Sequence, residues 1–181
     1  MACASTIRPT SPYEAGFAEA ILPEVERAAA LVRDVGWMLD VMTPCWLTME
    51  LLPYLDRMKI TYTLGHFGKF AAANGTDHSV FKELASRFAK GEGRCWIKLC
   101  AAYQVSDQPD FADVAPITRA LYEAAPERVI WGTDWPHIRH EAVGNAGALL
   151  DLFAAWFPEN ADRQRVLVDN PARLFGFDVR S

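Results

Sequence analysis

The residue best placed for chemistry is Asp134, in the segment RVIWGTDWPHIRH, residues 128–140. An apolar run with the character of a buried strand precedes it, and Gly-Thr ends that run just before the carboxylate. A carboxylate at a strand exit can act as a general base or as a metal ligand. It can also cap or turn the next segment. The first interpretation gains weight because the exits of adjacent barrel strands point into one shared bowl.

A second candidate is His66, which follows another apolar run and lies in the sequence GHFGK, residues 65–69. The two flanking glycines indicate close approach of backbone segments and an unusual turn. An imidazole at a strand exit can bind a metal ion or donate to a developing oxyanion. The plainer alternative is a histidine that is packed and hydrogen bonded in the core.

Several further donors also follow the predicted strands. As a set they suit an anionic or polyhydroxylated substrate, although each alone could be an ordinary loop residue. These predicted substrate-binding residues are Lys69, Tyr103, Gln104 and His137. We interpret His78 and His140 as surface residues, and Cys100, at a strand end without an evident base partner, as part of the core.

The elements that must position these residues follow a repeating pattern. Four short, nearly continuous apolar runs predict strands covered on both faces. They lie at residues 37–42, 60–65, 95–100 and 128–133. Helical patterns lie at residues 15–34, 46–57, 78–90, 110–125, 145–157 and 160–169. Within them, Pro23 predicts a break or a new first turn, and Asp77 predicts an N-cap.

This order of strands and helices predicts an α/β fold with a parallel sheet. Two architectures fit it: an open doubly wound sheet, or part of a (β/α)8 TIM barrel, which normally needs about 250 residues. Both architectures place active sites at the carboxyl ends of their strands, where the candidate residues fall. The glycine-rich nucleotide-binding fingerprints are absent from every strand exit.

Length and composition narrow the class of protein. The chain has 181 residues, 51% of them hydrophobic, so we expect one globular domain over residues 1–181, with residues 1–13 as a disordered lead-in. The net charge is −5 and no basic stripe occurs, so nucleic acid is not an expected partner. The four cysteines form no CxxC pair, which favours a reduced protein. No signal-like or membrane-length run occurs, so we expect a cytoplasmic protein with no membrane partner.

Four motifs, in this order and at this spacing, resemble the amidohydrolase-2 family. They are HFGK (66–69), CWIKLCAAYQVS (95–106), RVIWGTDWPH (128–137) and VDNPARLFGF (168–177). The resemblance is to the branch that includes 2-pyrone-4,6-dicarboxylate lactonase and sugar-lactone hydrolases, and it runs from about residue 14 to the end of the chain. It implies a distorted barrel of which this chain holds the C-terminal strands and helices, and a small-molecule substrate such as a lactone or a carboxylic acid.

The resemblance also implies roles for single residues. Asp134 matches the aspartate of the last strand, which activates the attacking water, and His66 matches the histidine that ends strand five. Three features depart from the family. The family's opening His-x-His strand has no counterpart, so we expect the first third of the barrel to be missing. Lys69 and Gln104 stand where arginines are expected, which weakens carboxylate clamping and favours a sugar lactone or another less charged ring ester.

Three functions remain open from the sequence. The leading hypothesis is a hydrolase that opens a lactone or similar cyclic ester with water activated by Asp134. The second is a metal-dependent decarboxylase of the same superfamily. The third is a catalytically inactive fragment that self-associates as a homo-oligomer. A stable zinc site needs about three protein ligands, and the sequence offers His66 and Asp134, with His137 as a conceivable third, so we expect weak metal binding or none.

Overall fold

The computed structural model describes residues 3–7, 16–90 and 93–178, and its centre is a five-stranded parallel sheet. The strands are β1 (Cys3–Ile7), β2 (Met38–Val41), β3 (Tyr62–Leu64), β4 (Cys95–Leu99) and β5 (Val129–Trp131). They lie side by side in chain order, and each pairs in parallel with the next. The four strands predicted from apolar runs are therefore confirmed, each slightly shorter than its run.

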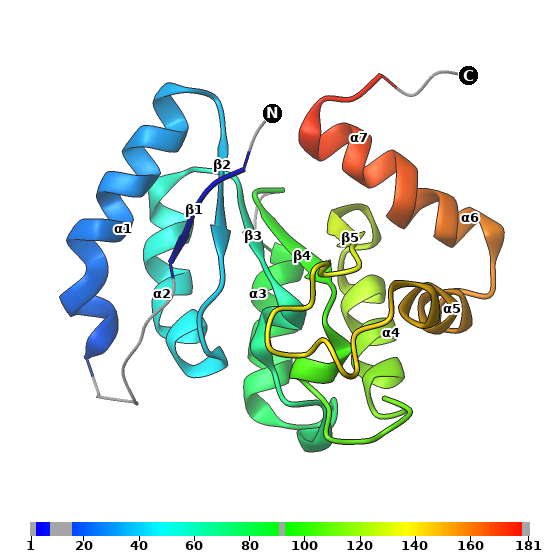
Figure 1. Ribbon diagram of the computed structural model, residues 1–181. Coiled ribbons are helices and arrows are strands. Elements are labelled where there is room, and N and C mark those ends of the chain that lie inside the picture. The colour runs from blue at the N-terminus through cyan, green and yellow to red at the C-terminus, as the bar shows by residue number, and fades with distance from the viewer. Residues whose placement is uncertain (1–2, 8–15, 91–92, 179–181) are drawn as a thin grey trace.

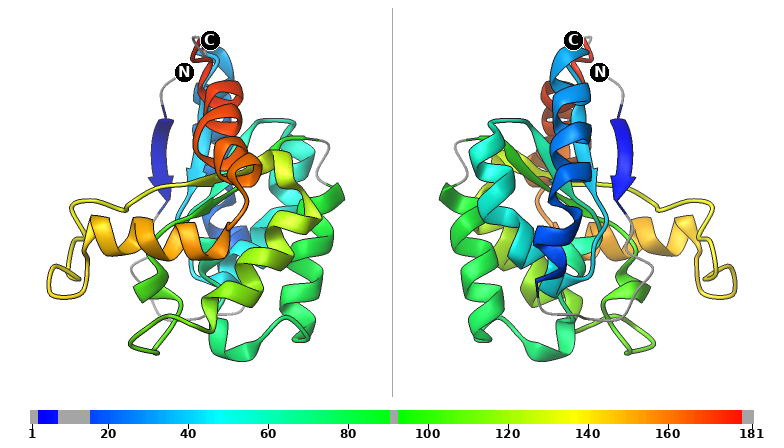
Figure 2. Two further views of the ribbon diagram at one scale, coloured as in Figure 1. Left: turned by 90° about the vertical axis from the view of Figure 1, so that its right-hand side faces the viewer. Right: turned by 90° about the vertical axis from the view of Figure 1, so that its left-hand side faces the viewer.

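Helices connect the strands and cover one side of the sheet. They are α1 (Phe17–Asp34), α2 (Cys45–Met58), α3 (Ser79–Lys90) and α4 (Val114–Ala124). Figure 2 shows α2, α3 and α4 on one side of the sheet and the segment 132–145 extending away from them, while α5 (Ala146–Trp156) packs its buried residues into the same core as these helices. A doubly wound sheet reverses its strand order and carries helices on both faces. The consecutive order, with the helices that connect the strands on one side, instead matches an arc of a (β/α)8 barrel (Figure 1).

The strands separate two layers of side chains because successive residues point to opposite faces. On the outer face, residues such as Leu39, Ile97 and Val129 join the helices in the main hydrophobic core. On the inner face, Met38 and Trp96 belong to a smaller apolar cluster near the amino ends of the strands. The candidate residues lie beyond this cluster, at the carboxyl ends of the same strands.

The chain closes with a nearly continuous helical stretch. It comprises α6 (Asn160–Gln164), a wide π-type turn (Arg165–Asp169) and α7 (Asn170–Phe175). Asn170 is buried, and its side-chain amide donates to the carbonyl oxygens of Pro126 at 2.8 Å and Val129 at 2.7 Å. These bonds tie the stretch to β5, and Leu174 packs in the inner apolar cluster.

Three local expectations need correction. Residues 3–7 of the expected disordered lead-in form β1, and the remainder of residues 1–13 lies outside the described part. Pro23 does not break α1, which runs through it unbroken. Asp77 does not cap α3: it pairs with Lys82 at 2.9 Å, while Nδ1 of His78 accepts from the backbone N–H of Val80.

A helix that crosses a bilayer needs about 20 consecutive, mainly apolar residues. Among the residues that the structure describes, no helix combines that length with the apolar character required.

Candidate active site

The carboxyl ends of β3, β4 and β5 carry unusual backbone that aims the candidate side chains. His66 begins a 3-10 turn (His66–Lys69) directly after β3, with a φ of 51°. After β4, Ala101 has a φ of 55°, and after β5, Asp134 has a φ of 62°. The left-handed region costs a residue with a side chain about 1–3 kcal/mol and is concentrated at functional sites. Its recurrence at three neighbouring strand exits marks this edge as the candidate site.

Asp134 and His66 meet at this edge, as the sequence predicts for residues at the exits of parallel strands. Nε2 of His66 lies 3.0 Å from Oδ1 of Asp134. Because a carboxylate only accepts, the ring nitrogen is the donor. The Tyr103 hydroxyl donates to Oδ2 of the same carboxylate at 2.7 Å. Both oxygens of Asp134 are therefore held in place by neighbouring side chains.

These contacts determine the charge of Asp134. Partial burial raises the pKa of its carboxyl group, but the hydrogen bonds from His66 and Tyr103 and the nearby histidines lower it more. The net pKa lies below the usual value, so Asp134 is ionised at neutral pH. Burial and the Asp134 carboxylate raise the pKa of Tyr103, which keeps its hydroxyl neutral and able to donate.

His137 and His140 stand behind Tyr103. Since the hydroxyl proton of Tyr103 points to Asp134, Nδ1 of His137 donates to the hydroxyl oxygen at 3.1 Å. The half-buried ring of His140 packs on the Tyr103 ring at 4.8 Å between centroids, a contact that its interpretation as a surface residue did not include. Gly144 makes room for His137, because a Cβ there would lie 2.3 Å from its Cγ. The two histidines thus support Tyr103.

Two cavities open beside His66. One, of about 550 Å³, is lined by residues that include Trp46, Lys69 and Gln104. In it the Lys69 ammonium donates to the side-chain oxygen of Gln104. Both side chains carry N–H donors, and Lys69 adds a positive charge to the lining of the cavity. The cavity therefore suits a substrate that carries a carbonyl or carboxylate oxygen.

The second cavity, of about 400 Å³, lies against Asp134 and has a charged floor that the sequence did not predict. Lys98 Nζ contacts Asp40 Oδ2 at 3.1 Å, and the Thr63 hydroxyl donates to the same carboxylate. All three residues are on the inner face of the sheet, one on each of three strands. The signal was present in the sequence, because a charged residue interrupts the apolar runs of β2 and β4.

The same edge gathers atoms that could hold a metal ion. One ligand atom each from His66, Cys100 and Asp134 lies within 4.8 Å of the others. The Nδ1 atom of buried His66 has no hydrogen-bond partner among the described residues. Zinc–ligand bonds of about 2.0–2.3 Å need only a modest contraction of this cluster, so the residues fit a divalent ion. Burial raises the pKa of the Cys100 thiol to about 12.

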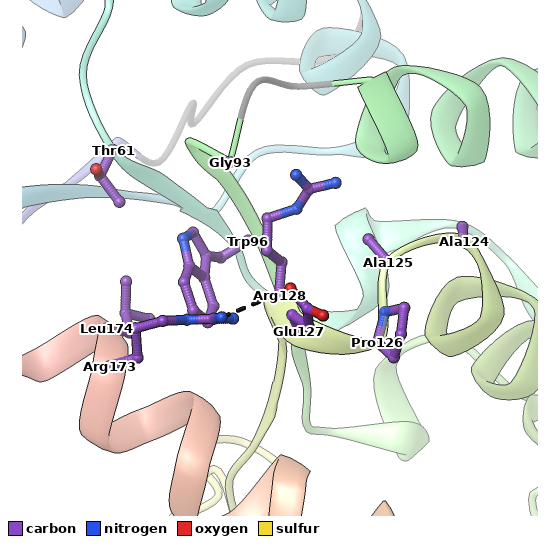
Figure 3. Close-up of a pocket in the computed structure, with 10 residues that line it drawn as sticks. All are labelled: Thr61, Gly93, Trp96, Ala124, Ala125, Pro126, Glu127, Arg128, Arg173 and Leu174. Carbon is purple, nitrogen blue, oxygen red and sulfur yellow. Dashed lines mark ion pairs between the residues drawn. The ribbon is translucent and has the colours of Figure 1, made fainter.

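A further cavity, of about 590 Å³, lies at the opposite edge of the sheet, at the amino ends of the strands (Figure 3). In Figure 3, Arg173 extends from α7 toward Glu127, with 3.6 Å between Nη1 and Oε2. The guanidinium also lies 5.1 Å from the centre of the Trp96 ring. None of the predicted site residues lines this cavity. We therefore assign these contacts to the attachment of α7.

Comparisons with known proteins show which family and fold the chain resembles. The amidohydrolase family model matches residues 9–177. A 4-sulfomuconolactone hydrolase of Hydrogenophaga intermedia is 34% identical over 155 residues, which are 83% of this chain and 50% of that protein. A D-galactarolactone isomerase of Agrobacterium fabrum is 32% identical over 158 residues, 85% of this chain and 53% of that protein. The chain thus spans about half the length of these relatives.

The fold also has counterparts among solved structures. A candidate 2-pyrone-4,6-dicarboxylic acid hydrolase from Pseudomonas putida superposes with a TM-score of 0.81 at 26% identity. The match covers 97% of this chain and 63% of that one. The match confirms the α/β fold and its likeness to part of a barrel.

Proposed function

Because the chain belongs to the amidohydrolase family, we propose that its carboxyl-edge site serves the hydrolysis of a lactone or a similar cyclic ester. The observation that carries the proposal is the Asp134 carboxylate, held through both oxygens and ionised at neutral pH beside a cavity. An ionised carboxylate in this setting can accept a proton from a water molecule. Two relatives are named for enzymes that act on a lactone, which supports a lactone as the substrate class.

The proposed reaction divides its work among the residues of the site. Asp134 accepts the proton of a water as its oxygen attacks the lactone carbonyl. The Tyr103 hydroxyl keeps the carboxylate oriented. His66, together with Asp134, would hold the divalent ion that polarises the carbonyl oxygen when it is bound. The ring oxygen leaves as an alcohol after it takes up the proton, and the product is a hydroxy acid.

We also propose that a divalent metal ion binds at this site. His66 and Asp134 would hold a divalent ion, which supplies polarisation of a carbonyl oxygen when it is bound. The substrate would occupy the two cavities, with Lys69 and Gln104 as its contacts in the larger one. Tyr103 and His137 act from behind Asp134 in this proposal. The cytoplasmic location of the protein stays a prediction.

The test is Asp134→Asn in the full chain, assayed by proton release from a panel of lactones that includes 4-sulfomuconolactone. The amide keeps the size of the side chain but cannot accept the proton, so we expect a loss of at least about 100-fold in rate, in the range of general-base catalysis. Asp151→Asn, which removes the charge of an exposed carboxylate on α5, is the control and should leave the rate unchanged. Undiminished hydrolysis in Asp134→Asn, or carbon dioxide release without ring opening, would refute the proposal.

A further inference from the structure

The metal ligands at the site form an unusual set, because one of the three residues in contact range is a cysteine. Cys100 lies directly after β4, between the strands that lead to His66 and Asp134. It is the side chain that joins these two in the 4.8 Å cluster. We propose that the Cys100 thiolate is the third protein ligand of the divalent ion at this site. This inference rests on the proposed function, which places an ion at His66 and Asp134.

The geometry of the cluster supports three ligands around one ion. Two ligands at about 2.05 Å from a tetrahedral zinc ion lie about 3.3 Å apart. Nε2 of His66 and Oδ1 of Asp134 lie 3.0 Å apart, close to that spacing. The Cys100 sulfur lies within 4.8 Å of a ring nitrogen of His66 and of a carboxylate oxygen of Asp134, so a shift of its side chain by about an ångström brings it to bonding distance. A fourth position stays open, as in catalytic zinc sites.

The surroundings of the cluster favour a bound ion as well. His66 is 3% exposed, so its ring lies in the protein interior beside Asp134. Cys100 is 5% exposed and lines the cavity next to Asp134. An inert core cysteine would be surrounded by apolar side chains, whereas Cys100 faces an imidazole and a carboxylate. The thiol thus has the neighbours of a ligand.

The chemistry of the set predicts which ions bind. The S–H bond of Cys100 breaks as the sulfur–metal bond forms, and its proton passes to the solvent. A thiolate selects zinc, cobalt and cadmium over magnesium, which prefers oxygen ligands. We therefore expect tight binding of cobalt or zinc with release of one proton, and no competition from magnesium.

The experiment is a titration of the full chain with cobalt chloride, followed by absorption spectroscopy and by calorimetry. Thiolate ligation produces a sulfur-to-cobalt charge-transfer band in the near ultraviolet, which ligation by nitrogen and oxygen alone does not. We expect this band in the wild type and its loss in Cys100→Ser, with weaker cobalt binding by at least about tenfold. Cys95→Ser, a buried cysteine of the same strand that faces the outer core, should retain the band.

Each of the other possible results would overturn the inference, and each excludes a different part of the proposed site. Cobalt binding without the band removes Cys100 from the ligand set and leaves the proposed metal at His66 and Asp134. A band that survives in Cys100→Ser assigns it to another thiol. The absence of any cobalt binding refutes the metal itself, while the hydrolysis assay of Asp134→Asn still tests the base. Circular dichroism of each variant checks that the fold is intact.

Discussion

Lys69 gives the larger cavity a means to distinguish charged from neutral substrates. Its ammonium donates to the neutral side chain of Gln104, and both line the larger cavity beside His66. A substrate carboxylate that enters this cavity would gain a charged hydrogen bond, worth about 1.5–3 kcal/mol. A neutral lactone would gain much less, because it brings no negative charge.

We therefore expect Lys69→Met to weaken binding of carboxylate-bearing ligands by about 10- to 100-fold. The affinity for the ring-opened acid product, measured by calorimetry, should fall, while that for an uncharged lactone should change little. Lys82→Met, on the exposed face of α3, is the control for the loss of one positive charge. An equal loss for charged and neutral ligands would show that Lys69 only maintains the shape of the cavity.

The site residues differ in how far the sequence could predict them. The meeting of Asp134 with His66 followed from their places at strand exits, because parallel strands end at one edge. The place of Cys100 in the same cluster was missed. Its neighbours come from the strands before and after it, so no local pattern shows them. The support of Tyr103 by His137 and His140 depends on the path of segment 132–145. That path could not be predicted, because the segment has no hydrophobic periodicity.

At the scale of elements, the final helical stretch depends on one buried side chain. The Asn170 amide donates to two backbone carbonyls near the start of β5, at 2.8 and 2.7 Å. Its replacement by alanine would leave these carbonyls buried without partners, which costs about 1–3 kcal/mol. The final helical stretch would then lose its attachment to the sheet at Asn170, the first residue of α7.

Asn170→Ala should therefore lower the free energy of unfolding by about 1–3 kcal/mol, measured by urea denaturation with circular dichroism. Gln164→Ala is the matched control, since Gln164 bonds to Asp169 on the exposed surface, and its effect should stay within about 0.5 kcal/mol. Similar losses in both variants would mean that the amide bonds of Asn170 do not hold α7 to the sheet.

The strands and helices were predicted with different success. The four apolar runs identified β2 to β5, because brief apolar runs between helical segments are typical of strands buried in a parallel sheet. The last helical pattern was expected to end at residue 169, just before the segment NPARLFGF. In the structure Pro171 is in the first turn of α7, where its missing N–H is not needed. Whether a proline ends a helix or begins one depends on contacts such as those of Asn170.

At the scale of the whole molecule, the described strands form an open, curved sheet rather than a closed barrel (Figure 1). A closed barrel of this type needs eight strands, and five are described here. The π-type turn and α7 pack against β5 at one edge. At the other edge, β1 pairs only with β2 among the described strands. The sequence predicted the parallel sheet, but β1 (CASTI) was missed because it is short and made mostly of small residues, so no run of large apolar residues marks it.

The pairing of β1 with a single neighbour among the described strands predicts self-association. An unpaired edge strand offers a row of backbone donors and acceptors to another chain, and a lysine in such a strand opposes pairing. We expect the wild type to sediment as dimers or larger species at higher concentration, and Thr6→Lys in β1 to shift it toward the monomer. Ser86→Lys, on the exposed face of α3, adds the same charge elsewhere and should not. A wild type that stays monomeric at all concentrations, in sedimentation velocity runs, would contradict pairing through β1.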